Sequence, residues 1–185
     1  MDIDQNYSGT VDNYIVLMGQ NDGDKGLEID GPEGSTYTDG LFTLRNGWIR
    51  SDQSGTHSAV DLKSSAQGNV MNTVFEGFNA GKMILFRASY NTDDCTLKEG
   101  DASGHFISHR LLVGNNKFIT NTTDIKEIAN AYANSDHIDA CGADLPTNYQ
   151  EAIDQLIFEQ GNTIESSVSP YVDLSVFNGG WCVTQ

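Results

Sequence analysis

The sequence predicts a parallel β-helix, a solenoid of short strands, and three observations lead to this fold class. Apolar residues surround an asparagine in the same order in the stretches 11–16, 44–49 and 70–75. A second set of short stretches alternates apolar and acidic residues. Turn signals rich in glycine separate the two sets. A unit that recurs about every 30 residues is too small to bury its own apolar side, so it must stack on its neighbours.

The asparagines at the centre of the repeated stretches are Asn13, Asn46 and Asn72. We expect each to sit at a sharp bend between two strands, because Asn tolerates positive φ better than other non-glycine residues. Their side-chain amides would then form a structural ladder along the solenoid axis. The alternative is a β-sandwich in which these residues occupy unrelated turns.

The other strands follow in chain order. The alternating stretches 2–4, 27–30 and 59–62 predict strands with one buried and one solvated face. The longer loops 31–40 and 51–56 would project from one side. A fourth turn is expected at 82–87 and a fifth strand at 106–113, where His109 takes the asparagine position.

The period becomes helical after Thr120. Apolar spacing predicts one helix over 125–132 and a second over 147–159. A solenoid needs its last open edge covered, and amphipathic helices can cover it. We therefore divide the chain into β-helix turns at 1–120 and a helical cap with a closing tail at 121–185. Because residues 1–4 already look like a strand, the turns are expected to be the C-terminal part of a longer solenoid.

The formal net charge of −16 limits the partners. Such a field repels nucleic acid and anionic membranes, and it suits divalent cations or neutral glycans. No apolar run in the sequence is long enough to span a bilayer.

The 3 cysteines lack the C-x-x-C spacing of a zinc site. One disulfide and one free thiol would fit an oxidising compartment, whereas three buried thiols would fit the cytosol. Cys95 and Cys141 both lie in polar, loop-like sequence, so we favour a bridge between them and a free Cys182.

The stretches 2–13, 26–34 and 42–47 resemble the secreted right-handed β-helix surface proteins of Bacteroidetes, which are often named only as lipoproteins or multidomain proteins. The string Leu-Glu-Ile-Asp-Gly-Pro-Glu-Gly at 27–34 is the most specific part, and the Gly-Gly-Trp at 179–181 is similar to that family's ending. The resemblance implies a right-handed, pectate-lyase-like solenoid on or outside the cell. It also implies a missing N-terminal part of the same solenoid as a partner. The family has no agreed activity.

Acidic residues suggest a calcium site in two places. Asp4, Asp30 and Asp61 are each expected to end a short strand and would stack on one outer face. Asp22 and Asp24 lie in a short loop with oxygen ligands at alternating positions. We name Asp22, Asp24 and Asp30 as candidate Ca²⁺ ligands. The alternative in both places is solvated acids beside glycine turns.

Aromatic residues in loops suggest a glycan site. Tyr37 and Tyr90 are the candidates for stacking on sugars. The function expected first is a non-catalytic module, extracellular or on the outer-membrane surface, that binds glycan or another envelope component such as a surface protein. The alternatives are a polysaccharide lyase or hydrolase on the same scaffold, with Arg45, Arg50 or Arg87 as base, and a purely structural stalk.

Overall fold

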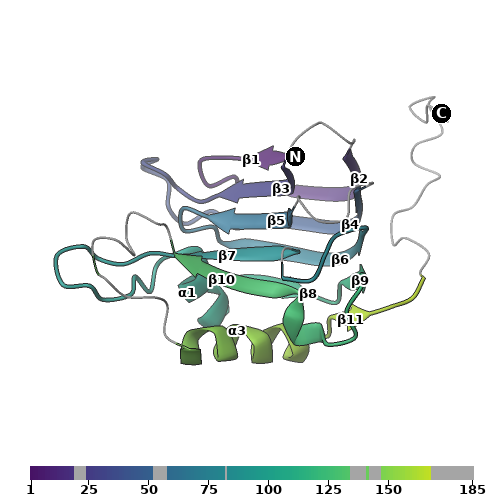
Figure 1. The fold of residues 1–185 in the computed structure, drawn as a ribbon. Helices are drawn as coiled ribbons and strands as arrows, with labels where there is room; N and C mark the ends of the chain where they lie inside the picture. Colours follow the sequence, from purple (N-terminus) through teal and green to yellow (C-terminus); the bar gives the residue numbers. More distant parts are fainter. Residues whose placement is uncertain (19–23, 52–57, 82, 134–140, 142–146, 168–185) are drawn as a thin grey trace.

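The computed structural model describes residues 1–18, 24–51, 58–81, 83–133, 141 and 147–167. Within them the chain is mostly β, and its strands form parallel sheets accompanied by few helices (Figure 1). This arrangement is compatible with a β-solenoid. Asp22, Cys182 and the predicted closing tail lie outside the described residues.

Two parallel sheets hold the strands. Sheet A contains, in spatial order, β1 (Asp2–Ile3), β3 (Lys25–Asp30), β5 (Ser58–Lys63), β7 (Ile84–Ala88) and β10 (Ala129–Ala133). Sheet B contains β2 (Thr10–Met18), β4 (Phe42–Ser51), β6 (Gly68–Glu76), β9 (Lys117–Ile119) and β11 (Thr163–Ile164), and β8 (Leu111–Gly114) also pairs with β6. From β1 to β7, consecutive strands belong in turn to sheet A and sheet B. Residues far apart in sequence therefore become neighbours along the stack.

One hydrophobic core joins the inner faces of the two sheets. Leucines, isoleucines and phenylalanines at alternate strand positions point into it, as a period of two requires. Phe75 and Phe118 stack at 5.0 Å between ring centroids. Phe86 meets Phe106 at 4.4 Å, and Phe106 comes from the short helix α1 (Ala102–Ile107). The core therefore continues from the sheets into the helical segment.

The three predicted bend asparagines share one column of sheet B. Strand register places Asn13, Asn46 and Asn72 opposite one another, with φ of 58°, 57° and 50°. Asn72 Nδ2 donates to Asn46 Oδ1 at 3.4 Å, and Asn46 Nδ2 donates to Asp12 Oδ1 at 2.8 Å. Asp12 Oδ1 also accepts from Asn13 Nδ2 at 3.2 Å. The carboxylate of Asp12 thus lies between the first two amides.

A fourth asparagine of this column was missed by the sequence analysis. Register across β6, β8 and β9 places Asn115, with φ of 53°, opposite Asn72. The pattern was hidden because Lys117 stands where the earlier repeats have an apolar residue two positions after the asparagine. That position is half-buried at Ile15 and Trp48 and buried at Val74, and Lys117 itself is half-buried.

A column of buried polar side chains lies next to the bend asparagines of sheet B. Asn116 Oδ1 accepts from the backbone N–H of Thr73 at 2.9 Å, and Asn116 Nδ2 donates to the Val70 carbonyl at 3.1 Å. Asn162 Oδ1 accepts from the backbone N–H of Asn116 at 3.1 Å, and its Nδ2 donates to the Val113 carbonyl at 2.7 Å. These side chains complete the pairing of buried backbone groups where the strands bend.

Tyr14 extends the same column at the other end. Its hydroxyl lies 2.9 Å from Thr73 Oγ1, although Gly47 stands between them in the register. A Cβ at Gly47 would lie 2.3 Å from the ring carbon Cζ of Tyr14. Glycine is therefore required at position 47 to make room for the ring. Burial of the hydroxyl raises the pKa of Tyr14.

The strand predicted at 106–113 is wrong in its first half. Phe106 and Ile107 end helix α1, and strand pairing begins only at Leu111. His109 has a φ of 61° but lies between α1 and β8, so it is not the bend residue of this turn. Helix α1 escaped prediction because it has only 6 residues, including Gly104.

The helix predicted over 125–132 is also wrong. A single 3₁₀ turn, η1 (Ile125–Glu127), is followed by strand β10, which pairs with β7. Tertiary pairing overrode the helical spacing here. The helix predicted over 147–159 is confirmed as α3 (Thr147–Glu159). Its Gln150 side chain accepts from the backbone N–H of Ala131 at 2.8 Å and donates to the Ala129 carbonyl at 3.2 Å, so it occupies polar groups on the open edge of β10.

We expect Asn116→Ala to lower the free energy of unfolding by roughly 2–4 kcal/mol, because it leaves two buried backbone groups unpaired. Asn46→Ala, at a half-exposed position, should cost roughly 1–2 kcal/mol, mainly through the left-handed φ. Asn46→Gly should recover most of that loss, since glycine accepts this φ. Urea unfolding of the three variants measures the order. Equal losses for Asn46→Ala and Asn116→Ala would contradict it.

Candidate functional site

The polar face of sheet A gathers charged residues from several turns of the chain. Inward positions of β3 and β5 hold leucine, isoleucine and valine, so the residues between them face outward. Register places Asp30 opposite Lys63, and Arg87 opposite Tyr132 on the next pair of strands. These residues stand at or near the C-terminal ends of their strands, along the side of the sheet where the strands end (Figure 1). We call this side the strand-end edge.

A connected polar network centres on Asp61, whose exposed fraction is only 3%. Tyr132 donates its hydroxyl proton to Asp61 Oδ1 at 2.7 Å, and Lys25 Nζ lies 3.5 Å from Asp61 Oδ2. Arg87 donates to the same Tyr132 oxygen from Nε at 3.1 Å and from a terminal nitrogen at 2.8 Å. A buried carboxylate is tolerated here because each oxygen has a partner.

The network shifts the titration of its members. Burial, followed by the hydrogen bond to Asp61, raises the pKa of Tyr132 to about 12. Burial opposes the charge of Arg87, but Tyr132 together with Asp61 and Asp101 raises the pKa of its guanidinium above the ordinary value. Arg87 is therefore held as a cation.

A pocket of about 610 Å³ opens beside this network, where the turns after β5 and β7 meet the start of α1. Its lining is polar: Ser64, Ser65, Arg87, Ser89, Asn91, Lys98, Glu99, Gly100 and Asp101. Asp101 is buried, caps α1 through the backbone N–H of Ala102 at 2.8 Å and accepts from the Ser89 hydroxyl. A second hollow of about 570 Å³ shares Glu99 and Gly100 with the first and is bordered by Leu97, Ile107 and Tyr149 among others.

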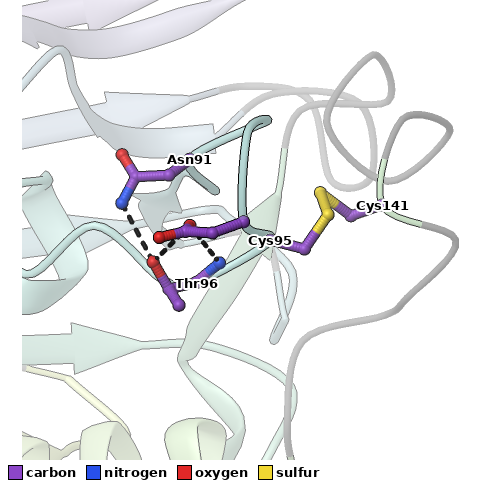
Figure 2. The surroundings of a disulfide bond; sticks show 5 residues. Asn91, Cys95, Thr96 and Cys141 are labelled. Carbon is purple, nitrogen blue, oxygen red and sulfur yellow. Dashed lines mark hydrogen bonds between the residues drawn. A yellow bond between two sulfur atoms is a disulfide. The ribbon is translucent and has the colours of Figure 1, made fainter.

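A disulfide bond anchors the loop that borders the pocket. Cys95 is bonded to Cys141, the predicted pair, with their Cα atoms 5.5 Å apart (Figure 2). Side chains hold the same loop: Asn91 Nδ2 donates to Thr96 Oγ1 at 3.0 Å, and Asp94 Oδ1 accepts from the backbone N–H of Thr96 at 3.0 Å. These bonds hold the pocket residue Asn91 to the loop that carries Cys95.

The structure describes two of the three predicted calcium ligands, Asp24 and Asp30. Asp22 lies outside the described residues, and Asp24 is 76% exposed and pairs with Lys25 at 2.8 Å. The predicted stack of Asp4, Asp30 and Asp61 is wrong in its third member. Register aligns Asp61 with Glu28 and aligns Asp30 with Lys63 instead. Asp30 lies beside Asp2 and Asp4.

The two predicted sugar-binding tyrosines differ in access. Tyr37 is 54% exposed and its carbonyl accepts from Asn6 Nδ2 at 3.1 Å. Tyr90 is only 4% exposed and forms a β-bridge with Leu97, so its ring offers no face to a sugar. Sequence reasoning missed Tyr149, which borders the second hollow and whose hydroxyl lies 3.2 Å from Ser103 Oγ.

The arginines considered as lyase bases all have acidic or phenolic partners. Arg45 pairs with Asp12 at 2.7 Å, and Arg50 lies 3.8 Å from Glu76. Arg87 is bound by Tyr132, as described above. Proton abstraction requires a neutral base, and the partners of Arg87 favour its charged form.

Comparisons with protein-family models, with curated proteins and with solved structures found no match to this chain. Among the described helices, none is long and apolar enough to cross a membrane.

We expect the disulfide to leave one modifiable thiol in the intact protein, because the sequence holds 3 cysteines and the bridge uses Cys95 and Cys141. Intact mass after alkylation without reductant measures this number. The bridge closes a loop with a sequence separation of 46. Chain entropy then predicts that the Cys95→Ser, Cys141→Ser double variant loses about 4 kcal/mol of stability. Three alkylated thiols in the unreduced protein would contradict the bridge.

The hydroxyl of Tyr132 should lose its proton at a higher pH than an ordinary tyrosine does. Its folded pKa of about 12 lies above the ordinary value near 10, so the unfolded chain releases this proton first as the pH rises. Its contribution to stability is therefore complete below about pH 10 and is lost as the pH approaches 12. Ultraviolet absorbance of the phenolate should show one late-titrating group fewer in Tyr132→Phe. The same late titration in wild type and variant would argue against the network.

Proposed function

We propose that this chain belongs to a right-handed parallel β-helix, closed at one end by α3, that acts outside the cell and binds a neutral glycan without cleaving it. The fold part of this proposal is supported by the alternation of consecutive strands between two parallel sheets. Right-handedness follows the strong preference of parallel crossover connections.

The contacts of α3 support its role as a cap. Ile153 and Ile157 are fully buried against the core, while Gln150 bonds to the backbone of β10. An edge strand left open would pair with another chain, and covering it is the usual remedy. The disulfide supports an oxidising environment, because cytosolic proteins seldom keep structural disulfides.

The observation that carries the binding proposal is the polar pocket at the strand-end edge. Arg87 and Lys98 face Glu99 and Asp101 within its lining, so the charges balance although the chain as a whole is strongly acidic. Serines and an asparagine supply further donors and acceptors. Such a site suits a ligand that carries many hydroxyls and no net charge. The adjoining hollow, with Leu97, Ile107 and Tyr149, supplies the apolar side that a sugar ring also presents.

The network around Arg87 favours binding over cleavage. A lyase must neutralise the carboxylate of an acidic sugar and then remove a proton with a positioned base. The net charge of −16 repels such a substrate, and the raised pKa of Arg87 opposes the base role. A structural stalk requires no pocket of this kind.

We expect the protein to be retarded in native gels that contain one of a panel of neutral polysaccharides. Lys98→Ala and Glu99→Ala should each weaken that retardation roughly 5-fold to 10-fold, because each removes a charged hydrogen-bonding group at the pocket rim. Lys117→Ala is the matched control, since Lys117 lies on β9 of sheet B, and it should bind as the wild type does.

Two outcomes would contradict the proposal. Retardation that is equally strong in the pocket variants and the control would place binding elsewhere. A steady rise in the ultraviolet absorbance of unsaturated product on pectate or alginate, abolished in Arg87→Ala, would replace the binding module with a lyase.

A further inference from the structure

Three carboxylates converge at the β1 end of sheet A. Asp2 and Asp4 flank Ile3, whose side chain is buried, so both carboxylates leave the strand on its outer face. The pairing of Ile3 with Ile29 brings Asp4 alongside Asp30. One carboxylate oxygen from each of Asp2, Asp4 and Asp30 lies within 4.8 Å of the others. We call these residues the acidic triad.

One member of the triad carries an unpaired buried oxygen. Asp30 has an exposed fraction of 4%, and its Oδ2 is held by Lys63 Nζ at 3.1 Å. Its Oδ1 is buried and has no hydrogen-bond partner among the described residues. Leaving a buried carboxylate oxygen without a partner is costly. Since Lys63 occupies Oδ2, Oδ1 is the oxygen of Asp30 that is left without a partner.

The carboxylates in and around the triad outnumber the described cations that pair with them. Lys63 Nζ is shared between Asp30 and Glu28, which it meets at 2.6 Å. Glu33, three residues after Asp30, adds a further exposed carboxylate. A cation bound among these groups would relieve this repulsion.

The backbone holds the triad in place. Asn6 follows Asp4 by two residues and is 4% exposed. Its backbone N–H donates to the Gly31 carbonyl at 3.0 Å, directly after Asp30. Its side chain donates to the Tyr37 carbonyl at 3.1 Å and accepts from Gln67 Nε2 at 2.9 Å. The two turns that carry Asp4 and Asp30 are thus joined to each other, which lowers the entropy cost of binding an ion.

We propose that the acidic triad binds one calcium ion. Two oxygens that lie about 2.4 Å from the same Ca²⁺ are at most about 4.8 Å apart, and the triad meets this limit. Calcium accepts monodentate and bidentate carboxylates in irregular geometry, with water completing its shell, whereas Mg²⁺ requires a tighter octahedron. The ion joins β1 to β3, because Asp2 and Asp4 belong to the first turn and Asp30 to the next. The triad shares no residue with the lining of the polar pocket.

The test is thermal unfolding of the whole chain in chelator and in about 10 mM calcium chloride, at matched ionic strength. With a dissociation constant of roughly 0.1–1 mM, as in extracellular calcium modules, the melting temperature should rise by roughly 3–10 °C. Titration calorimetry with calcium chloride should give one site. Magnesium chloride should give a smaller shift.

Variants locate the ion. Asp30→Asn should abolish the calcium-dependent shift, and Asp2→Asn, at an exposed position, should weaken binding at least about 10-fold while the protein stays folded in chelator. Asp24→Asn is the matched control, because Asp24 is an exposed acid outside the triad, and it should keep the full shift. The proposal is overturned if calcium leaves the melting temperature of the wild type unchanged. It is also overturned if Asp2→Asn binds calcium as the wild type does, or if Asp24→Asn alone loses the shift.

Discussion

Parallel pairing between successive turns is the interaction on which the rest of this structure depends, and it requires the chain to bend sharply at the same rung each time. Asn13, Asn46, Asn72 and Asn115 make that bend with a left-handed φ, which most side chains disfavour. The bend interrupts the regular backbone ladder. Asn116 and Asn162, buried one position further on, supply the missing hydrogen bonds. Register is thereby specified twice, by the conformation of the outer asparagines and by the bonds of the inner ones.

This register also decides which polar residues meet. A shift of one residue would turn each strand over and send its acidic residues into the core. With the register as it is, Asp30 faces Lys63 on the neighbouring strand and lies beside Asp2 and Asp4. Tyr132, far along the chain, reaches Asp61. The candidate sites are therefore products of stacking: the acidic triad joins the first two turns, and the polar pocket forms where later turns meet α1.

Sequence reasoning succeeded where one local rule and the tertiary structure agree. The alternating stretches became strands of sheet A, and the amphipathic stretch at 147–159 became a helix. It failed where tertiary pairing overrode local spacing, as in β10, whose residues had helical periodicity. It also failed at Asn115, because the outward position after the bend holds Lys117 rather than an apolar residue. Tyr90 shows that sequence reasoning about sites fails in the same way. Its loop-like sequence suggested an exposed ring, but the residue is only 4% exposed in the fold.

By itself, the sequence determined the strand-rich repeat, its first three bend residues and the acidic balance, because these depend on local conformational preference, short periodicity and composition. Only the tertiary structure decided which carboxylates share a site and which residues line a pocket. Those facts depend on contacts between strands of sheet A and the turns after them, which lie about 30 residues or more apart in the chain, and the asparagine pattern belongs to sheet B. Asp61 illustrates the difference. The sequence predicted an acidic residue in a short strand, but it placed Asp61 at the strand end, and its partners, Lys25 and Tyr132, come from other turns of the stack.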